Sequence, residues 1–108
     1  MNFDDYQNKA VTTAIYPKNQ ATQYLTLGLV SEAGEVAGKL KKIIRDREGV
    51  IGVYEKSVIA DELGDVLWYI ACLAIELNIP MSVIAENNIA KLEDRRSRDV
   101  LKGSGDKR

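Results

Sequence analysis

Apolar residues recur at helical spacing along four stretches of the chain, and the sequence carries almost no strand pattern. The only two prolines, Pro17 and Pro80, both lie between these stretches, where a helix ends or begins. The predicted helices cover residues 4–16, 20–45, 55–77 and 80–96. Because short links join them, we expect an all-α fold, an antiparallel four-helix bundle-like domain.

The chain length of 108 residues predicts a single domain that spans residues 1–108. The composition changes only near the end, where residues 94–108 are polar, charged and contain glycine. We expect this segment to form a flexible, basic C-terminal arm, which either closes on a bound anion or stays disordered.

Charge and residue counts exclude several classes of function. The net charge is −1, so no basic excess is present to hold a nucleic acid. The chain has no histidine and one cysteine, Cys72, which excludes histidine catalysis, thiolate zinc sites and disulfides. The strongly apolar uncharged run of residues 66–75 is half of the ~20 residues that a bilayer span requires, and the acidic N-terminus is no signal peptide. We therefore expect a cytoplasmic protein with no nucleic-acid partner and no membrane partner.

Two pairs of acidic residues, Glu32 with Glu35 and Glu62 with Asp65, stand out on the second and third helices. The spacing within each pair places both carboxylates on one helix face, and that face is also the apolar stripe of its helix. An acidic pair of this kind is often only a solvated helix face, and this alternative stays open. Gly28 lies on the same stripe as the first pair, either for close helix packing or to leave room for a ligand.

Four carboxylates brought together lose hydration and repel one another. Protonation, basic partners or a bound cation would relieve this repulsion, and the single nearby Lys39 cannot offset four charges. A site made only of carboxylate oxygens favours Mg²⁺ or Mn²⁺ over Zn²⁺ or Cu²⁺. A di-iron or di-manganese bundle would use Glu-x-x-His motifs, and the absence of histidine disfavours it.

The fourth helix carries Asn88, Lys91 and Arg95 on one stripe, which either holds phosphate oxygens or forms a solvated edge. Tyr69 follows Asp65 by one turn and could contact a sugar or a base. Tyr16 lies between the first two helices and could stack on a base. Core packing is the more common role for both tyrosines.

These residues together resemble a known family. The pattern E-x-x-E, then 26 residues, then E-x-x-D is similar to the signature of the all-α nucleoside triphosphate pyrophosphohydrolases, the MazG-like superfamily. The family's second helix resembles the segment GLVSEAGEVAGKLKK of this chain, its third helix resembles DELGDVLWYIACLA, and its fourth resembles NNIAKLEDRR. The terminal GSGDKR resembles the end of many small members of the family. The resemblance covers residues 21–108. The chain departs from the family at Ser31, where many members carry a further Glu, and this difference affects the number of metal ions.

The resemblance implies hydrolysis of a nucleoside triphosphate to the monophosphate and pyrophosphate, in nucleotide-pool housecleaning of dNTPs or non-standard NTPs. It implies Mg²⁺, for which Mn²⁺ can substitute, and a metal-bound water that attacks the α-phosphorus and is oriented or deprotonated by Glu32 or Glu35. The implied metal ligands are Glu32, Glu35, Glu62 and Asp65. The candidate substrate-binding residues are Tyr16, Lys39, Tyr69, Asn88, Lys91 and Arg95. The family also implies a homodimer or a homotetramer, which agrees with the broad apolar surface of the third helix.

A second hypothesis is a non-catalytic helical module that binds a nucleotide or another protein. In that case the acidic pairs are only surface, and divalent metal ions would not raise the melting temperature. A bound metal ion would raise it by mass action.

Overall fold

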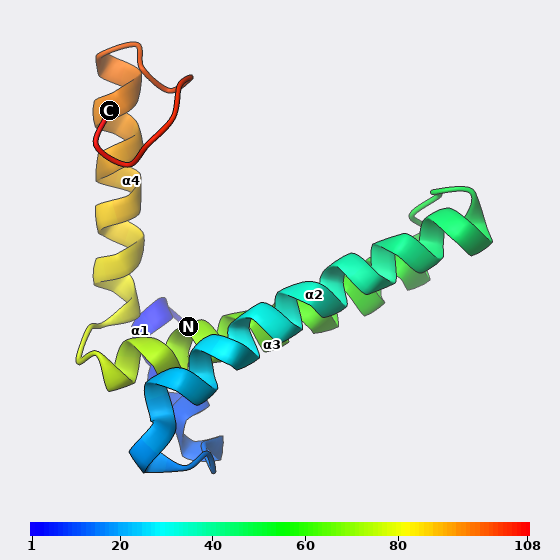
Figure 1. The fold of residues 1–108 in the computed structure, drawn as a ribbon, viewed down its shortest axis with the longest axis horizontal. Helices are drawn as coiled ribbons and strands as arrows, with labels where there is room; N and C mark the ends of the chain where they lie inside the picture. Colours follow the sequence, from blue (N-terminus) through cyan, green and yellow to red (C-terminus); the bar gives the residue numbers. More distant parts are fainter.

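A computed structural model describes all of residues 1–108, and every regular element in it is helical (Figure 1). This confirms the predicted all-α class. The elements in chain order are α1 (Phe3–Ala10), η1 (Val11–Thr13), η2 (Lys18–Gln20), α2 (Ala21–Arg47), α3 (Val53–Glu76) and α4 (Met81–Ser97).

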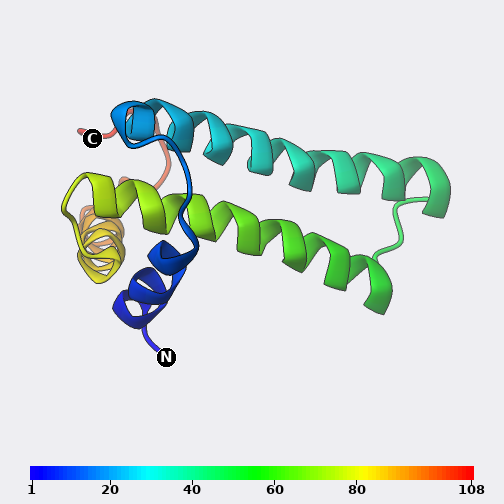
Figure 2. The same ribbon diagram turned by 90° about the horizontal axis from the view of Figure 1, so that it is seen from below.

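The two longest helices, α2 and α3, lie side by side as an antiparallel hairpin, and α1 packs against α3 (Figure 2). The helix α2 ends where Glu48 adopts the left-handed conformation with φ 54°, and the Gly49 N–H donates to the Ile43 carbonyl. The helix α3 begins where the Gly52 N–H donates to Glu55 Oε1 at 2.9 Å. A turn of five residues thus reverses the chain and aligns the faces of the two helices.

The first helix is shorter than the predicted range of 4–16, because α1 gives way to the 3₁₀ turn η1 after Ala10. The hydroxyls of Thr12 and Thr13 donate to the Lys9 and Ala10 carbonyls at 2.6 and 2.8 Å. Side-chain bonds of this kind compete with the helical backbone pattern. The backbone is extended from Ala14, which separates α1 from α2.

The fourth helix departs from α3 at an angle of 103° and contacts α1. Two side chains of α1 hold its first turn in this direction. The Asp4 carboxylate accepts from the Ser82 N–H and hydroxyl at 2.9 and 2.7 Å. The buried Gln7 accepts from the Met81 N–H at 3.0 Å. As a result, α4 projects from the hairpin in this chain and does not lie along it (Figure 1).

The core lies where α1, the start of α2, the end of α3 and the start of α4 meet. It consists of two small clusters: Ala10, Ala71, Ala74 and Met81 in one, and Tyr16, Ala21, Leu25 and Cys72 in the other. Trp68 packs against both clusters, and its Nε1 donates to the Ala10 carbonyl at 3.1 Å and to Thr13 Oγ1 at 2.9 Å.

Much apolar surface stays uncovered in the single chain. Only 11 of 108 residues are buried, and Leu27, Val30 and Ile44 of α2 are 71%, 67% and 61% exposed. The radius of gyration is 16.8 Å, whereas a compact chain of this length has about 13 Å. The shape is therefore that of a hairpin and an arm that share a small core at one end.

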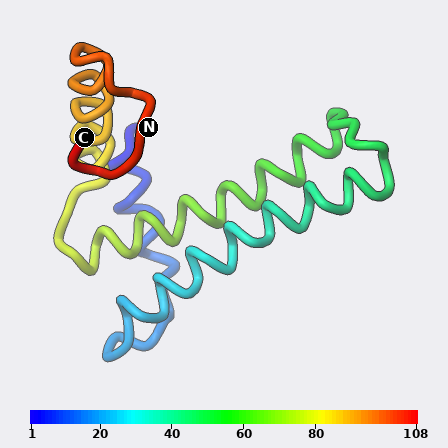
Figure 3. Tube along the Cα trace, turned by 45° about the horizontal axis from the view of Figure 1, so that its top comes forward, coloured from blue at the N-terminus to red at the C-terminus, as the bar shows by residue number.

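The end of the chain turns back beside α4 (Figure 3). Residues 94–97 of the predicted flexible arm still belong to α4, and residues 98–108 form a loop that hydrogen bonds to itself and to the helix. No single helix has the length and apolar character needed to cross a membrane. The α3 and α4 pair meets that criterion only when taken together, across their bend of 103°.

Candidate active site

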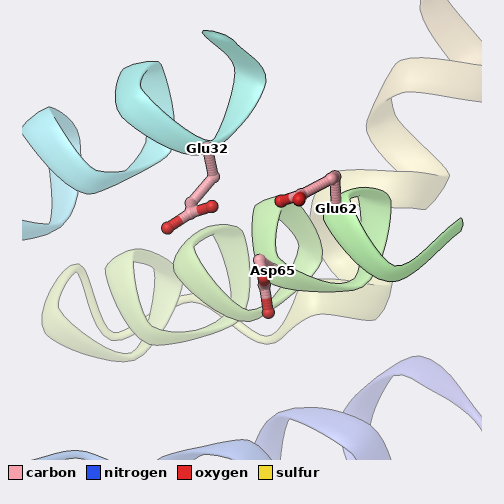
Figure 4. Close-up of side chains that lie close together, drawn as sticks. All are labelled: Glu32, Glu62 and Asp65. Atoms are coloured by element: carbon pink, nitrogen blue, oxygen red, sulfur yellow. The ribbon is translucent and has the colours of Figure 1, made fainter. Parts of the chain in front are cut away.

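Three carboxylates meet between α2 and α3. Glu32 extends from α2 toward Glu62 of α3, with Asp65 one turn further along α3 (Figure 4). One oxygen from each residue lies within 4.8 Å of the others. The spacing of Glu62 and Asp65 places them on one helix face, and the antiparallel hairpin brings that face opposite Glu32. We call Glu32, Glu62 and Asp65 the acidic cluster.

The acidic cluster carries an excess of negative charge. Partial burial raises the pKa of Glu32, and the charges of Asp65, Glu62 and Glu35 raise it further, in that order. The ion pair that reaches the cluster joins Lys39 Nζ to Glu62 Oε1 at 3.7 Å. One ammonium group cannot balance three carboxylates, so a cation at this position would be favoured.

The donor set of the cluster fits a hard divalent cation, because all of its ligands are carboxylate oxygens. Three of the four predicted metal ligands therefore lie close together in the acidic cluster. The fourth, Glu35, is exposed on α2 outside this group of three, although its charge contributes to the raised pKa of Glu32.

Tyr69 lies beside the acidic cluster, as its position one turn after Asp65 predicts. Burial raises the pKa of its hydroxyl, with further contributions from Tyr24, Glu32 and Asp65. Its ring packs edge-to-face on Trp68, with centroids 5.0 Å apart. The ring also lies directly against Gly28, so that glycine serves close packing of the two helices and leaves no room for a ligand there.

Tyr16 has a packing role in this structure. Its ring is 6% exposed and lies in the core with Ala21 and Leu25. Its hydroxyl donates to Glu76 Oε1 at 2.6 Å, and the Lys18 ammonium lies 4.4 Å from the ring centroid. The ring is thus covered on the faces that a base would need.

The predicted phosphate ligands Asn88, Lys91 and Arg95 lie on α4, which projects away from the acidic cluster (Figure 1). Asn88 is exposed, whereas Lys91 and Arg95 both face Asp106 of the C-terminal loop, at 3.7 and 3.8 Å. One chain therefore does not bring these residues to the cluster. The contacts of Asp106 were not predicted, because the sequence indicates a basic arm there and the lone acid of GSGDKR is their only signal.

The fold and the site define a class: an all-helical protein with a carboxylate cluster, suited to a cation, between two antiparallel helices. The MazG nucleotide pyrophosphohydrolase domain matches residues 20–100, and the chain belongs to this family. It is also 46% identical over 114 aligned positions to the Gene 37 protein of Mycobacterium phage L5, with all of both chains covered. That name describes no activity. No solved structure matches the chain.

Proposed function

We propose that this chain hydrolyses nucleoside triphosphates to the monophosphate and pyrophosphate in a Mg²⁺-dependent reaction, with dNTPs or non-standard NTPs as substrates. The observation that carries the proposal is the acidic cluster within a MazG domain. Mg²⁺ bound there would balance the carboxylate charges, bind phosphate oxygens and activate a water molecule.

The residues around the cluster divide the remaining tasks. Glu32, Glu62 and Asp65 hold the metal ion. Glu35 stands one turn along α2 and outside the cluster, which leaves its carboxylate free to orient or deprotonate the attacking water. Lys39, 3.7 Å from Glu62, supplies a positive charge for phosphate oxygens. Tyr69 offers a ring and a hydroxyl to the sugar or base.

We also propose that the active form is a homodimer or a homotetramer in which a second copy completes the site. Two observations support this. Apolar side chains along the hairpin are uncovered, among them Leu27, Val30 and Leu63, and such surface marks an association site. In addition, α4, which carries Lys91 and Arg95, projects away from the part of the hairpin that holds the acidic cluster of its own chain (Figure 1). The α4 of another copy is therefore the available source of these two positive charges.

A hydrolysis assay tests the chemical proposal. The purified chain is incubated with a panel of NTPs and dNTPs, with and without Mg²⁺, and pyrophosphate and monophosphate are both measured. We expect Glu62→Gln and Asp65→Asn to lower turnover by more than ~100-fold, because even residues that only orient metal ligands contribute about 10–100-fold. Asp61→Asn is the matched control, since Asp61 lies next to Glu62 on α3 but outside the cluster.

Melting temperature provides a second readout that separates binding from catalysis. Mg²⁺ should raise it in the wild type by mass action, and should not raise it in Glu62→Gln. Without metal, Glu62→Gln should melt above the wild type because it relieves repulsion. Release of orthophosphate would contradict the assigned bond. A melting temperature that does not respond to Mg²⁺, together with no turnover of any nucleotide, would favour the alternative of a binding module.

Mixing two inactive variants tests whether the site is shared between copies. The Glu62→Gln variant lacks one carboxylate of the acidic cluster, and the Lys91→Ala variant lacks the ammonium group of Lys91 on α4. Random exchange of subunits in a twofold dimer makes about half of the dimers mixed. Each mixed dimer has one intact site of its two, so the mixture should regain about a quarter of wild-type activity. A mixture that stays inactive, or a chain that stays monomeric in light scattering, would contradict the shared site.

A further inference from the structure

The C-terminal loop is tied into a closed shape by its last residue. The Arg108 guanidinium donates to the carbonyls of Val100, Leu101 and Gly105 at 3.0, 3.0 and 2.6 Å. Arg98 of the preceding turn donates to the Arg108 carbonyl at 2.7 Å. Gly105, at φ +86°, adopts the left-handed conformation that lets the chain reverse.

The closed loop places Asp106 on the two basic residues of α4 that were expected to hold phosphate. The Arg95 Nη2 donates to the Asp106 carbonyl at 2.8 Å, and Asp106 Oδ1 lies 3.7 Å from Lys91 Nζ and 3.8 Å from Arg95 Nη2. The Arg95 side chain is only 6% exposed as a result. The positive charges of α4 thus face an anion that belongs to their own chain, in a segment that turns back beside α4 (Figure 3).

We propose that the C-terminal loop is an intramolecular latch, in which Asp106 occupies the position between Lys91 and Arg95 that a polyphosphate takes when it binds. This inference rests on the proposed function, because that function assigns Lys91 and Arg95 to phosphate oxygens. A polyphosphate brings several charges and many acceptor oxygens to the same two cations, whereas Asp106 brings one carboxylate.

The geometry of the latch makes it displaceable. The Asp106 side chain is 86% exposed, and both of its ion pairs are longer than 3.5 Å. Exposed pairs of this kind are weak and are screened by salt. A triphosphate, which brings several charges to Lys91 and Arg95, therefore displaces Asp106 more readily than an anion with a single charge does.

Binding of inorganic tripolyphosphate to the full chain, without divalent metal, tests the latch. Calorimetry is run on the wild type, on Asp106→Asn and on the control Asp99→Asn. Asp99 lies in the same segment and forms no ion pair with Lys91 or Arg95, and its left-handed φ of 56° also suits asparagine. We expect Asp106→Asn to bind about two- to fivefold more tightly, the range that an exposed ion pair provides, and Asp99→Asn to bind as the wild type does. In Asp106→Asn, the further change Lys91→Ala should remove the gain.

Hydrogen exchange distinguishes a loop that the anion displaces from a loop that closes over the anion, because the exchange rate of its amide protons changes in opposite directions. A displaced loop exchanges its amide protons at residues 99–108 faster when wild-type protein is saturated with tripolyphosphate. A loop that wraps around the anion would exchange them more slowly, which would overturn the proposal. Equal or weaker binding by Asp106→Asn, or no tripolyphosphate binding by the wild type, would also overturn it. Neither result bears on Mg²⁺-dependent turnover, so a failed latch and a failed hydrolase proposal are distinguishable.

Discussion

Replacing Gly28 by alanine tests how closely α2 and α3 pack beside the acidic cluster. A Cβ atom at this position would lie 2.0 Å from Tyr69 Cε1, 2.4 Å from Cζ and 2.5 Å from Cδ1. Carbon atoms in contact are about 3.5–4.0 Å apart, so the ring would have to move by about 1.5 Å. Tyr69 is also held by Trp68, whose ring it meets edge-to-face, and therefore the ring cannot move without loss of that contact.

The magnitude follows from opposing effects. Overpacking of this kind typically costs about 1–3 kcal/mol, and a lost aromatic pair costs about 0.5–1.5 kcal/mol. Alanine in place of glycine inside a helix raises the free energy of unfolding by about 1 kcal/mol through its higher helix propensity. We therefore expect Gly28→Ala to lower the free energy of unfolding by about 0.5–3.5 kcal/mol, with about 2 kcal/mol at the centre of this range. Gly34→Ala on the same helix meets nothing within 4 Å and should raise it by about 0.5–1 kcal/mol.

Urea titration at one fixed protein concentration measures both variants against the wild type. The double variant Gly28→Ala/Tyr69→Leu completes the test, because removal of the ring should abolish most of the penalty. If Gly28→Ala is as stable as Gly34→Ala, or if its penalty is the same without the Tyr69 ring, the contact between Gly28 and Tyr69 is not the cause of the destabilisation.

Two further predictions concern the polar groups of the core. Gln7→Leu removes the side-chain partner of the Ala71 and Ile79 carbonyls and of the Met81 N–H. Urea titration should show that the free energy of unfolding falls by about 2–4 kcal/mol. The control Gln23→Leu, at an exposed position, should leave it nearly unchanged. Tyr16→Phe removes the hydroxyl that lowers the pKa of Glu76 below its ordinary 4.5. This contact stabilises the folded chain above pH 4.5, and the stabilisation is lost as pH falls through the lowered pKa of Glu76. Thermal melts at several pH values should therefore show that the melting temperature of the wild type exceeds that of Tyr16→Phe most at neutral pH, and that the difference narrows in acid.

The helices were predictable from the sequence because each has its own periodic apolar stripe and its own stop. Asn78 ends α3 in the left-handed conformation, with φ 57°, and Pro80 directly precedes α4, as the pattern indicates. The direction of α4 was not predictable. It depends on Asp4 and Gln7 of α1, which hydrogen bond to residues more than seventy positions away, and no local pattern reports such pairs.

The acidic cluster was predictable for a related reason. Helical spacing places Glu62 and Asp65 on one face, and an antiparallel hairpin is enough to bring Glu32 opposite them. The position of Glu35 outside the cluster depends on the rotation of α2 by a fraction of a turn, which periodicity does not resolve. The pairing of Asp106 with Lys91 depends on a loop closed by Arg108, and the same composition is equally consistent with a free tail.

The location of the cluster also supports the proposal that a second copy completes the site. The two core clusters lie at one end of the hairpin, and in the rest of α2, beyond Leu25, Ile43 is the only buried residue. Three mutually repelling carboxylates thus stand on a segment with little core of its own to oppose their repulsion. A cation reduces the repulsion, and a second copy packed on the exposed apolar side chains would restore the missing burial. If both contribute, dilution of the protein should weaken Mg²⁺ binding and Mg²⁺ should favour association, since the linkage between the two is reciprocal.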